Sequence, residues 1–159
     1  MKAALLHLAL MLNLCSSGLV VAQDSARFLP NPKLTPGDTL NTSKDDLCVY
    51  GYSSPAQKIP MRLKIQVFEG YGISATAVGY NVDHLIPVDL GGSNSMKNLW
   101  PQPLSGEWNY GMKNRLEKRL RKLVCSGELE LEKAQREIAA DWIAAYRKYM
   151  VNRRQGSRH

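Results

Sequence analysis

The segment between residues 81 and 102, NVDHLIPVDLGGSNSMKNLWPQ, constrains the fold of this chain more than any other part of it. The β-branched and apolar residues from position 75 to 90 predict a strand that leads into Asp83 and His84. Gly91 and Gly92 then predict a loop, because glycine adopts positive φ angles that other residues resist. An acid and a histidine are thus expected at the end of a strand, just before a tight loop.

The N-terminus carries a mostly apolar stretch between Lys2 and Gln23. A single positive charge, an apolar run and small residues before a plausible cleavage site are the three parts of a secretory signal peptide, which we expect over residues 1–22. A membrane anchor is the alternative, since the stretch approaches the ~20 apolar residues that a span requires. Polar residues interrupt the stretch and no positively charged stop follows, so we expect cleavage, a secreted or periplasmic protein, and no membrane association afterwards.

The chain has three cysteines, of which Cys15 would leave with the signal peptide. Cys48 and Cys125 remain as an even pair, which in an oxidising compartment predicts one disulfide. Two unrelated buried thiols are the alternative. A bridge would join the segment before the acid–histidine pair to the segment after it.

Beyond the signal peptide the length suits one domain, which we place at residues 47–151. Residues 23–46 are rich in Pro, Asn, Asp and Thr and are predicted to form an extended, irregular lead-in. Residues 152–159 form a basic tail. Between positions 61 and 67 apolar and polar residues alternate, which favours a half-buried strand and leaves a short helix as the alternative.

The C-terminal third predicts two helices. In the first, around residues 112–124, the apolar positions recur at helical spacing: Met112, Leu116, Leu120, Leu123 and Val124. The second is expected from about Glu130 to Val151, with Trp142 and Tyr146 on its apolar stripe. Core packing of this stripe is favoured over stacking on nucleobases.

Positive charge is concentrated in the first of these helices. The whole chain carries +7, and between Lys113 and Lys122 there are six basic residues and one acid, Glu117. This run indicates a polyanionic partner or, in the alternative, a solvated helix face. Only Lys113 points with the apolar stripe on a helical wheel. A bound phosphate would satisfy its charge, and snorkelling past the helix end is the alternative.

The stretch VDHLIPVDLGGSNSMKNLWPQP resembles the HNH family of endonucleases, part of the ββα-metal nuclease group. The resemblance is specific over residues 83–113. It implies a small α+β fold with a ββα-metal core, in which a two-stranded ribbon carries the acid–histidine pair. A helix from about Tyr110 would pack across the ribbon, and further C-terminal helices would cover the remaining apolar surface.

The resemblance also implies residue roles. Asp83 would bind a divalent metal ion, His84 would be the general base, and Asn98 would hold the imidazole in its orientation. Outside the family pattern, His84 is more simply a structural histidine and Asn98 a turn residue. The last ligand departs from the pattern, because no histidine follows Asn98 until position 159. Asn109 is expected to replace it, with Glu107 as the competitor.

Oxygen ligands favour Mg²⁺ or Mn²⁺ as the cofactor. The implied function is a secreted, metal-dependent endonuclease that hydrolyses DNA with little sequence specificity, with RNA left open as a second substrate. Lys113, Arg119 and Lys122 would contact substrate phosphates. The alternative is an exported nucleic-acid or polyanion-binding protein with an inactive site. No obligate protein partner is evident from the sequence.

Overall fold

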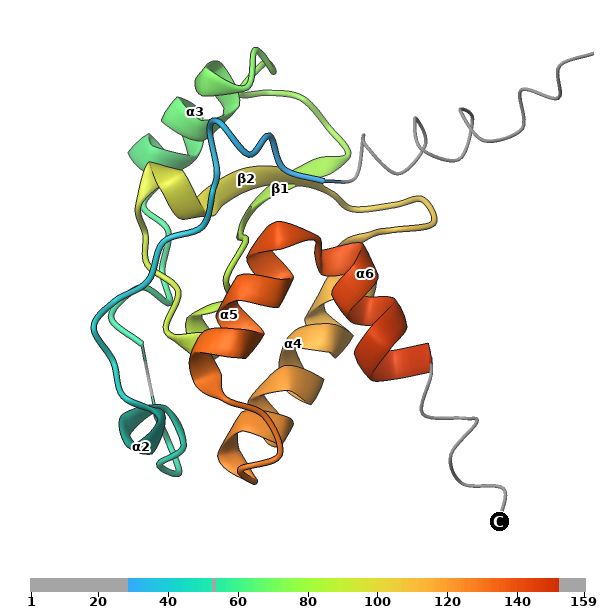
Figure 1. Ribbon diagram of the computed structural model, residues 1–159. Coiled ribbons are helices and arrows are strands. Elements are labelled where there is room, and N and C mark those ends of the chain that lie inside the picture. The colour runs from blue at the N-terminus through green and yellow to red at the C-terminus, as the bar shows by residue number, and fades with distance from the viewer. Residues whose placement is uncertain (1–28, 53, 152–159) are drawn as a thin grey trace, which may run out of the picture.

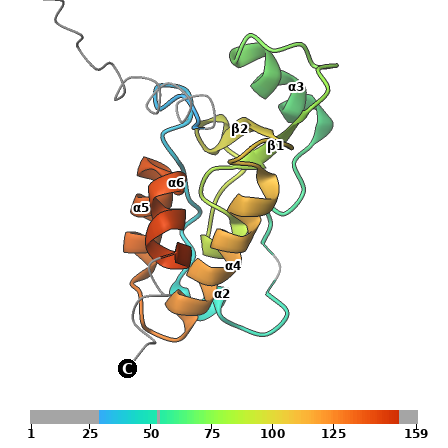
Figure 2. The same ribbon diagram turned by 90° about the vertical axis from the view of Figure 1, so that its right-hand side faces the viewer.

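The computed structural model describes residues 29–52 and 54–151, so the expected signal peptide and the basic tail lie outside the described residues (Figures 1 and 2). The fold is α+β. The helices are α2 (Lys44–Leu47), α3 (Met61–Gly70), α4 (Tyr110–Cys125), α5 (Leu131–Ala140) and α6 (Trp142–Tyr146), with a π-helical turn at Arg147–Val151. The strands are β1 (Tyr80–His84) and β2 (Leu99–Pro103), and 3₁₀ turns occupy Val88–Leu90 and Met96–Asn98.

The two strands form an antiparallel sheet that has helices on both faces. Tyr80 pairs with Pro103 at one end of the register and His84 with Leu99 at the other. Figure 1 shows α3 on one side of this sheet and the group α4, α5 and α6 on the other. Val82 and Leu99 pack in the core beneath α3, whereas Trp100 belongs to the larger core beneath the C-terminal helices. The end of β1 is therefore enclosed between two layers of helix.

The predicted strand before the acid–histidine pair is present but shorter than expected. β1 begins only after Gly79, whose φ of +91° is a turn conformation, and it ends at His84. Pro87 then lies in extended backbone and introduces the 3₁₀ turn Val88–Leu90. Turn residues on both sides thus limit the strand to five positions.

The alternating segment at positions 61–67 is a helix, so the strand favoured by its pattern is wrong. In α3 the buried residues are Val67 and Phe68, with Leu63 packed against the same cluster. Met61 and Ile65 stay exposed. Leu63 and Val67 are four apart and lie on one face of a helix, a spacing that the alternating pattern also contains.

The first C-terminal helix is confirmed as α4, together with the direction of its lysine. Lys113 is fully buried, as are Leu116 and Leu120 on the same stripe. The side chain of Asn109 begins the helix by accepting a hydrogen bond from the N–H of Met112 at 3.2 Å. Such N-caps satisfy a backbone donor that has no partner within the helix.

The second C-terminal helix is not continuous, which corrects the prediction of one helix from Glu130 to Val151. It breaks at Asp141, whose φ and ψ of −164° and 98° are extended. The Asp141 carboxylate accepts hydrogen bonds from the N–H groups of Ile143 and Ala144, both at 2.9 Å, and so caps α6. Trp142 and Tyr146 lie in the core and make edge-on contacts with Trp108, as expected of core residues.

The irregular lead-in is tied to the loop that follows β1. Thr39 forms an isolated bridge with Gly92, and the N–H of Leu40 donates to the carbonyl of Gly91 at 2.8 Å. The N–H of Ser93 donates to the carbonyl of Asp38 at 3.1 Å. Residues 38–40, which precede the domain start predicted at residue 47, therefore hold the loop that follows β1.

The disulfide between Cys48 and Cys125 is formed, with a Cα–Cα distance of 5.5 Å. It closes a loop over a sequence separation of 77 residues and joins the end of α2 to the end of α4. Within residues 29–52 and 54–151, no helix has the length and apolar character needed to cross a membrane.

Candidate functional site

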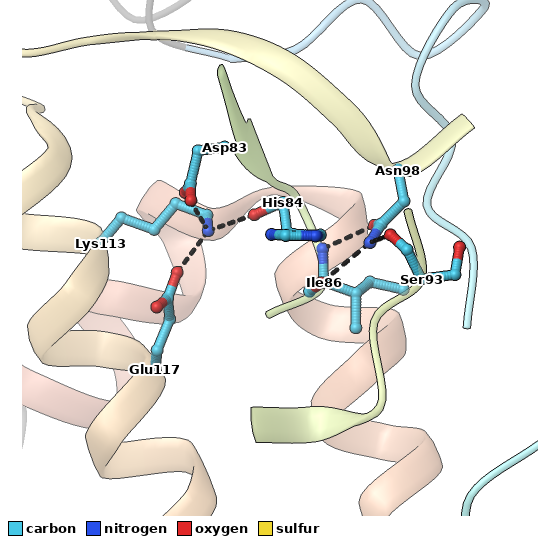
Figure 3. A network of polar contacts seen from close by, with 7 residues as sticks. All are labelled: Asp83, His84, Ile86, Ser93, Asn98, Lys113 and Glu117. Carbon is cyan, nitrogen blue, oxygen red and sulfur yellow. Dashed lines mark hydrogen bonds and ion pairs between the residues drawn. The ribbon is translucent and has the colours of Figure 1, made fainter. Parts of the chain in front are cut away.

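Three oxygen atoms surround the ammonium group of Lys113 at the end of β1 (Figure 3). Nζ of Lys113 donates to Oδ2 of Asp83 at 2.9 Å and to the backbone carbonyl of His84 at 2.5 Å. Its third contact is the carboxylate of Glu117, one helical turn further along α4. All three N–H bonds of the ammonium group thus have a partner.

The sequence predicts that Lys113 faces the core and that a bound phosphate satisfies its charge. The lysine does face the core, but its anionic partners are carboxylates of the same chain rather than a substrate phosphate. Burial opposes its charge, yet the carboxylates of Asp83 and Glu117 outweigh burial and raise the pKa of Lys113. In this arrangement Lys113 has no free proton to offer a phosphate, and it positions Asp83 and the backbone of His84 instead.

The cluster keeps one negative charge in excess. Glu117 is largely enclosed, and burial together with the charge of Asp83 raises its pKa, although Lys113 lowers it. Two carboxylates share one ammonium group, so the second negative charge is only partly compensated. The side chains of Asp83 and Glu117 each retain 18% exposure, so neither carboxylate is fully closed to solvent.

The imidazole of His84 is held in one tautomer. The Nδ2 group of Asn94 donates to the carbonyl of Lys58 at 2.9 Å, so its Oδ1 atom faces the imidazole. His84 Nε2 lies 2.8 Å from this Oδ1 atom and must be the donor. In the neutral ring the lone pair is therefore on Nδ1.

The imidazole is also held in its neutral form. Burial lowers the pKa of His84 below its ordinary value of 6.5, and the charge of Lys113 acts in the same direction. The hydrogen bond to Asn94, the charge of Asp83 and the backbone of Ala56 act in the opposite direction but do not outweigh burial. A histidine that is neutral near pH 7 can accept a proton.

Asn98 supports the loop after β1 and does not touch the imidazole. It is fully buried, and its Oδ1 atom accepts from the N–H of Ile86 at 2.9 Å while Nδ2 donates to the carbonyl of Ile86 at 3.0 Å. Nδ2 also donates to the carbonyl of Ser93 at 3.0 Å. The two bonds to Ile86 extend the pairing between the two segments to the second residue beyond His84. The side chain that hydrogen-bonds to the imidazole is Asn94, and the role predicted for Asn98 in orienting the ring stays a prediction.

The double glycine has a steric cause that the sequence pattern does not reveal. Gly91 has the expected positive φ of +81°, but the reason for glycine at position 92 is different. A Cβ atom on Gly92 would overlap the carbonyl oxygen of Ile86 and would lie 2.9 Å from Nδ2 of Asn98. The loop can close on Asn98 only because Gly92 has no side chain.

We expect Gly92→Ala to lower the free energy of unfolding by about 2 to 3 kcal/mol, the upper part of the usual cost of overpacking. Urea unfolding followed by circular dichroism measures this loss. Gly70→Ala is the matched control, because its added Cβ would meet only Met96 Cε at 3.9 Å, an ordinary contact. Equal stability of the two variants would contradict the proposed close approach.

Asn109, which the sequence predicts as the last metal ligand, caps the start of α4. Both ends of the Asn109 amide are bonded, with Oδ1 accepting from Met112 and Nδ2 donating to the carbonyl of Gly106 at 2.8 Å. Its competitor Glu107 is exposed. Within the described residues, no group of three or more His, Cys, Asp or Glu side chains could hold a metal ion. The assignment of the last ligand stays a prediction.

The other two predicted phosphate contacts, Arg119 and Lys122, lie in different surroundings. Lys122 is exposed and lines a groove beside the disulfide. Arg119 does not line that groove; it is half-buried, and its Nε atom is enclosed without a hydrogen-bond partner within the described residues. The two side chains are therefore not placed as one phosphate site.

Two residues of the site do not stand out from the sequence. Asn94 lies in a Gly-Gly-Ser-Asn run that predicts only a loop. Glu117 is the one acid among six basic residues, and its spacing of four from Lys113 is the spacing of an intrahelical ion pair. That spacing is the signal by which the buried cluster can be anticipated.

No protein-family model, no curated protein and no solved structure matches this chain.

Proposed function

We propose that this protein is a metal-dependent endonuclease of the HNH type, secreted by its producing cell, that hydrolyses phosphodiester bonds of DNA with little sequence specificity. Three features support the proposal: a two-stranded ribbon whose first strand ends at Asp83 and His84, the helix α4 whose Lys113 bonds to that strand end, and a loop clamped by Asn98. The disulfide supports export, because such bonds persist in oxidising compartments.

The observation that carries the proposal is the state of His84. A nuclease of this type needs a base that takes a proton from the attacking water, and that base must be neutral and fixed in orientation. Burial keeps the pKa of His84 low, and Asn94 orients its ring through Nε2. In our proposal Nδ1 is the atom that accepts the proton.

Asp83 and the carboxylate excess around it are the proposed cation site. Oδ2 of Asp83 is bonded to Lys113, so the other carboxylate oxygen is the one available for a metal ion. Few protein ligands and several waters would suit Mg²⁺ or Mn²⁺, and binding would be weak. When bound, such an ion would polarise the scissile phosphate and stabilise the leaving oxygen. Asn98 acts on this site indirectly, by holding the backbone at Ile86.

The second candidate is an exported polyanion-binding protein with an inactive site. The observation that favours it is the ammonium of Lys113, which already occupies the space between Asp83 and Glu117. If that ammonium group excludes divalent metal ions, the carboxylates are only a structural ion cluster. Basic residues of α4 would then bind nucleic acid without cleaving it.

Digestion of supercoiled plasmid by the mature protein distinguishes the two candidates. We expect nicking when Mg²⁺ or Mn²⁺ is added and none in EDTA, because the cation is needed for the phosphoryl chemistry. Conversion of supercoiled to open-circular DNA on a gel is the measurement. If the protein retards the plasmid on the gel but leaves it supercoiled at every metal concentration, the proposed enzyme is wrong and the polyanion-binding protein is favoured.

A further inference from the structure

A groove with a volume of about 650 Å³ lies at the far end of α4 from Lys113. One wall is the loop after α2, with Tyr50 and Tyr52, and the other is a face of α4. The disulfide between Cys48 and Cys125 joins the two walls. The volume falls within the range of about 300 to 1,000 Å³ that is usual for ligand sites.

The charges of the groove are predominantly positive and partly free. Arg121 is engaged, since it donates to the carbonyl of Leu47 at 2.9 Å and lies 3.7 Å from Oδ1 of Asp89. Lys118 and Lys122 are exposed, and in the described part of the chain no hydrogen bond or ion pair engages either ammonium group. Two free cations facing one cavity favour an anionic ligand with more than one charge.

The aromatic residues of the groove narrow the class of ligand. Tyr50 is fully exposed at 103%, so its ring is open to solvent and to a ligand. The hydroxyl of Tyr52, in the same wall, is enclosed and lacks a hydrogen-bond partner among the described residues. An open ring next to free lysines is the arrangement that receives an unpaired base and its phosphates.

We propose that this groove binds a single-stranded segment of nucleic acid, with Tyr50 stacking on a base and Lys118 and Lys122 contacting the adjoining phosphates. This inference rests on the proposed endonuclease function, because it names single-stranded nucleic acid as the form of substrate that the protein would hold near its cleavage site. Single strands fit because a base within a duplex has no free face for Tyr50.

The groove and the candidate cleavage site lie along the same helix. Lys113 and Lys122 are nine positions apart, which corresponds to about 13.5 Å along the helix axis at the helical rise of 1.5 Å per residue. That length is spanned by about four stacked nucleotides at 3.4 Å each. Lys118 and Lys122 face another side of α4 than Lys113, so a strand held in the groove would have to pass around the helix as well as along it to bring a phosphodiester to the end of β1.

Fluorescence anisotropy of a short labelled oligothymidine, measured in EDTA so that no cleavage occurs, tests the groove. We expect Tyr50→Ala to weaken binding by about 5-fold to 100-fold, the range found for loss of one stacked base. Tyr50→Phe keeps the ring and should retain wild-type affinity. Lys118→Ala with Lys122→Ala should weaken binding and lower the salt slope by about 1.4, or 0.7 for each phosphate contact.

The matched charge control is Arg62→Ala with Lys133→Ala, which removes two exposed charges that do not line the groove. Equal loss in this control and in the Lys118 and Lys122 variant would overturn the proposal in favour of unspecific attraction by net charge. So would wild-type affinity of Tyr50→Ala, or equal competition by duplex DNA or heparin.

A second substrate separates failure of the groove from failure of the enzyme. Bis(p-nitrophenyl) phosphate has no base to stack and needs the cleavage site alone, so its metal-dependent hydrolysis by the wild-type protein reports on the enzyme independently of oligothymidine binding. If hydrolysis occurs but Tyr50→Ala binds normally, the groove is wrong and the enzyme stands. If oligothymidine binds through Tyr50 without any hydrolysis, the groove stands and the proposed endonuclease is wrong.

Discussion

Replacing Lys113 with methionine is expected to lower the free energy of unfolding at neutral pH by about 3 kcal/mol. Breaking a buried ion pair usually costs about 3 to 5 kcal/mol, because it leaves a charge without compensation. We expect the lower end, since the side chains of Asp83 and Glu117 keep 18% exposure. Urea unfolding measures the change, and Lys118→Met, an exposed lysine of the same helix, should change stability little.

The pH dependence of this loss identifies its cause. Removing Lys113 removes the charge that lowers the pKa of Glu117, so a pKa already raised by burial rises further above its ordinary value of 4.5. A carboxyl whose pKa is higher in the folded than in the unfolded state gains stability as the pH falls through the folded pKa. The loss of unfolding free energy caused by Lys113→Met should therefore become smaller as the pH is lowered from neutral to about 4.5, the ordinary pKa of a glutamate side chain.

A double variant provides the internal check. Lys113→Met with Glu117→Gln removes the cation together with one of its two anions, so it should be less destabilised than Lys113→Met alone. A deficit that is independent of pH and unchanged by Glu117→Gln would mean that packing of the lysine stem, not charge, sets its contribution.

Local periodicity predicts α4 well because its apolar stripe is uninterrupted. The stripe by itself places Lys113 on the buried side of the helix, and this buried lysine is the centre of the ion cluster. The same periodicity fails after Ala140, because an aspartate within an apolar pattern can be either a solvated helix residue or the N-cap of a new helix. Only the tertiary position of Asp141 decides between them.

Contacts between distant segments lie beyond what the sequence pattern can predict. Nothing in the lead-in indicates that Asp38 and Thr39 fasten the loop at Gly92 and Ser93. For Asn98 the pattern does not tell whether the amide bonds to the imidazole or, as in the structure, to the backbone of Ile86. Hydrogen-bond partners of a side chain depend on packing, not on spacing along the chain.

Replacing His84 with alanine is expected to reduce metal-dependent nicking by a factor of about 10² to 10⁴, the usual contribution of a general base. Oligothymidine affinity should be unchanged, because the proposed groove lies at the other end of α4. Near-ultraviolet circular dichroism checks that the buried site has kept its packing. Undiminished nicking by the variant would exclude His84 as the base.

The pH profile tests the same assignment without removing the ring. The base acts when neutral, so kcat/KM should rise with pH through the pKa of His84 and level off above it. Because burial holds that pKa below 6.5, the rise should lie on the acid side of this value. Asn94→Asp places a carboxylate against Nε2, favours the charged ring and should move the rise to higher pH. A profile that Asn94→Asp leaves in place would mean that another group takes the proton, since the new carboxylate would directly contact the ring.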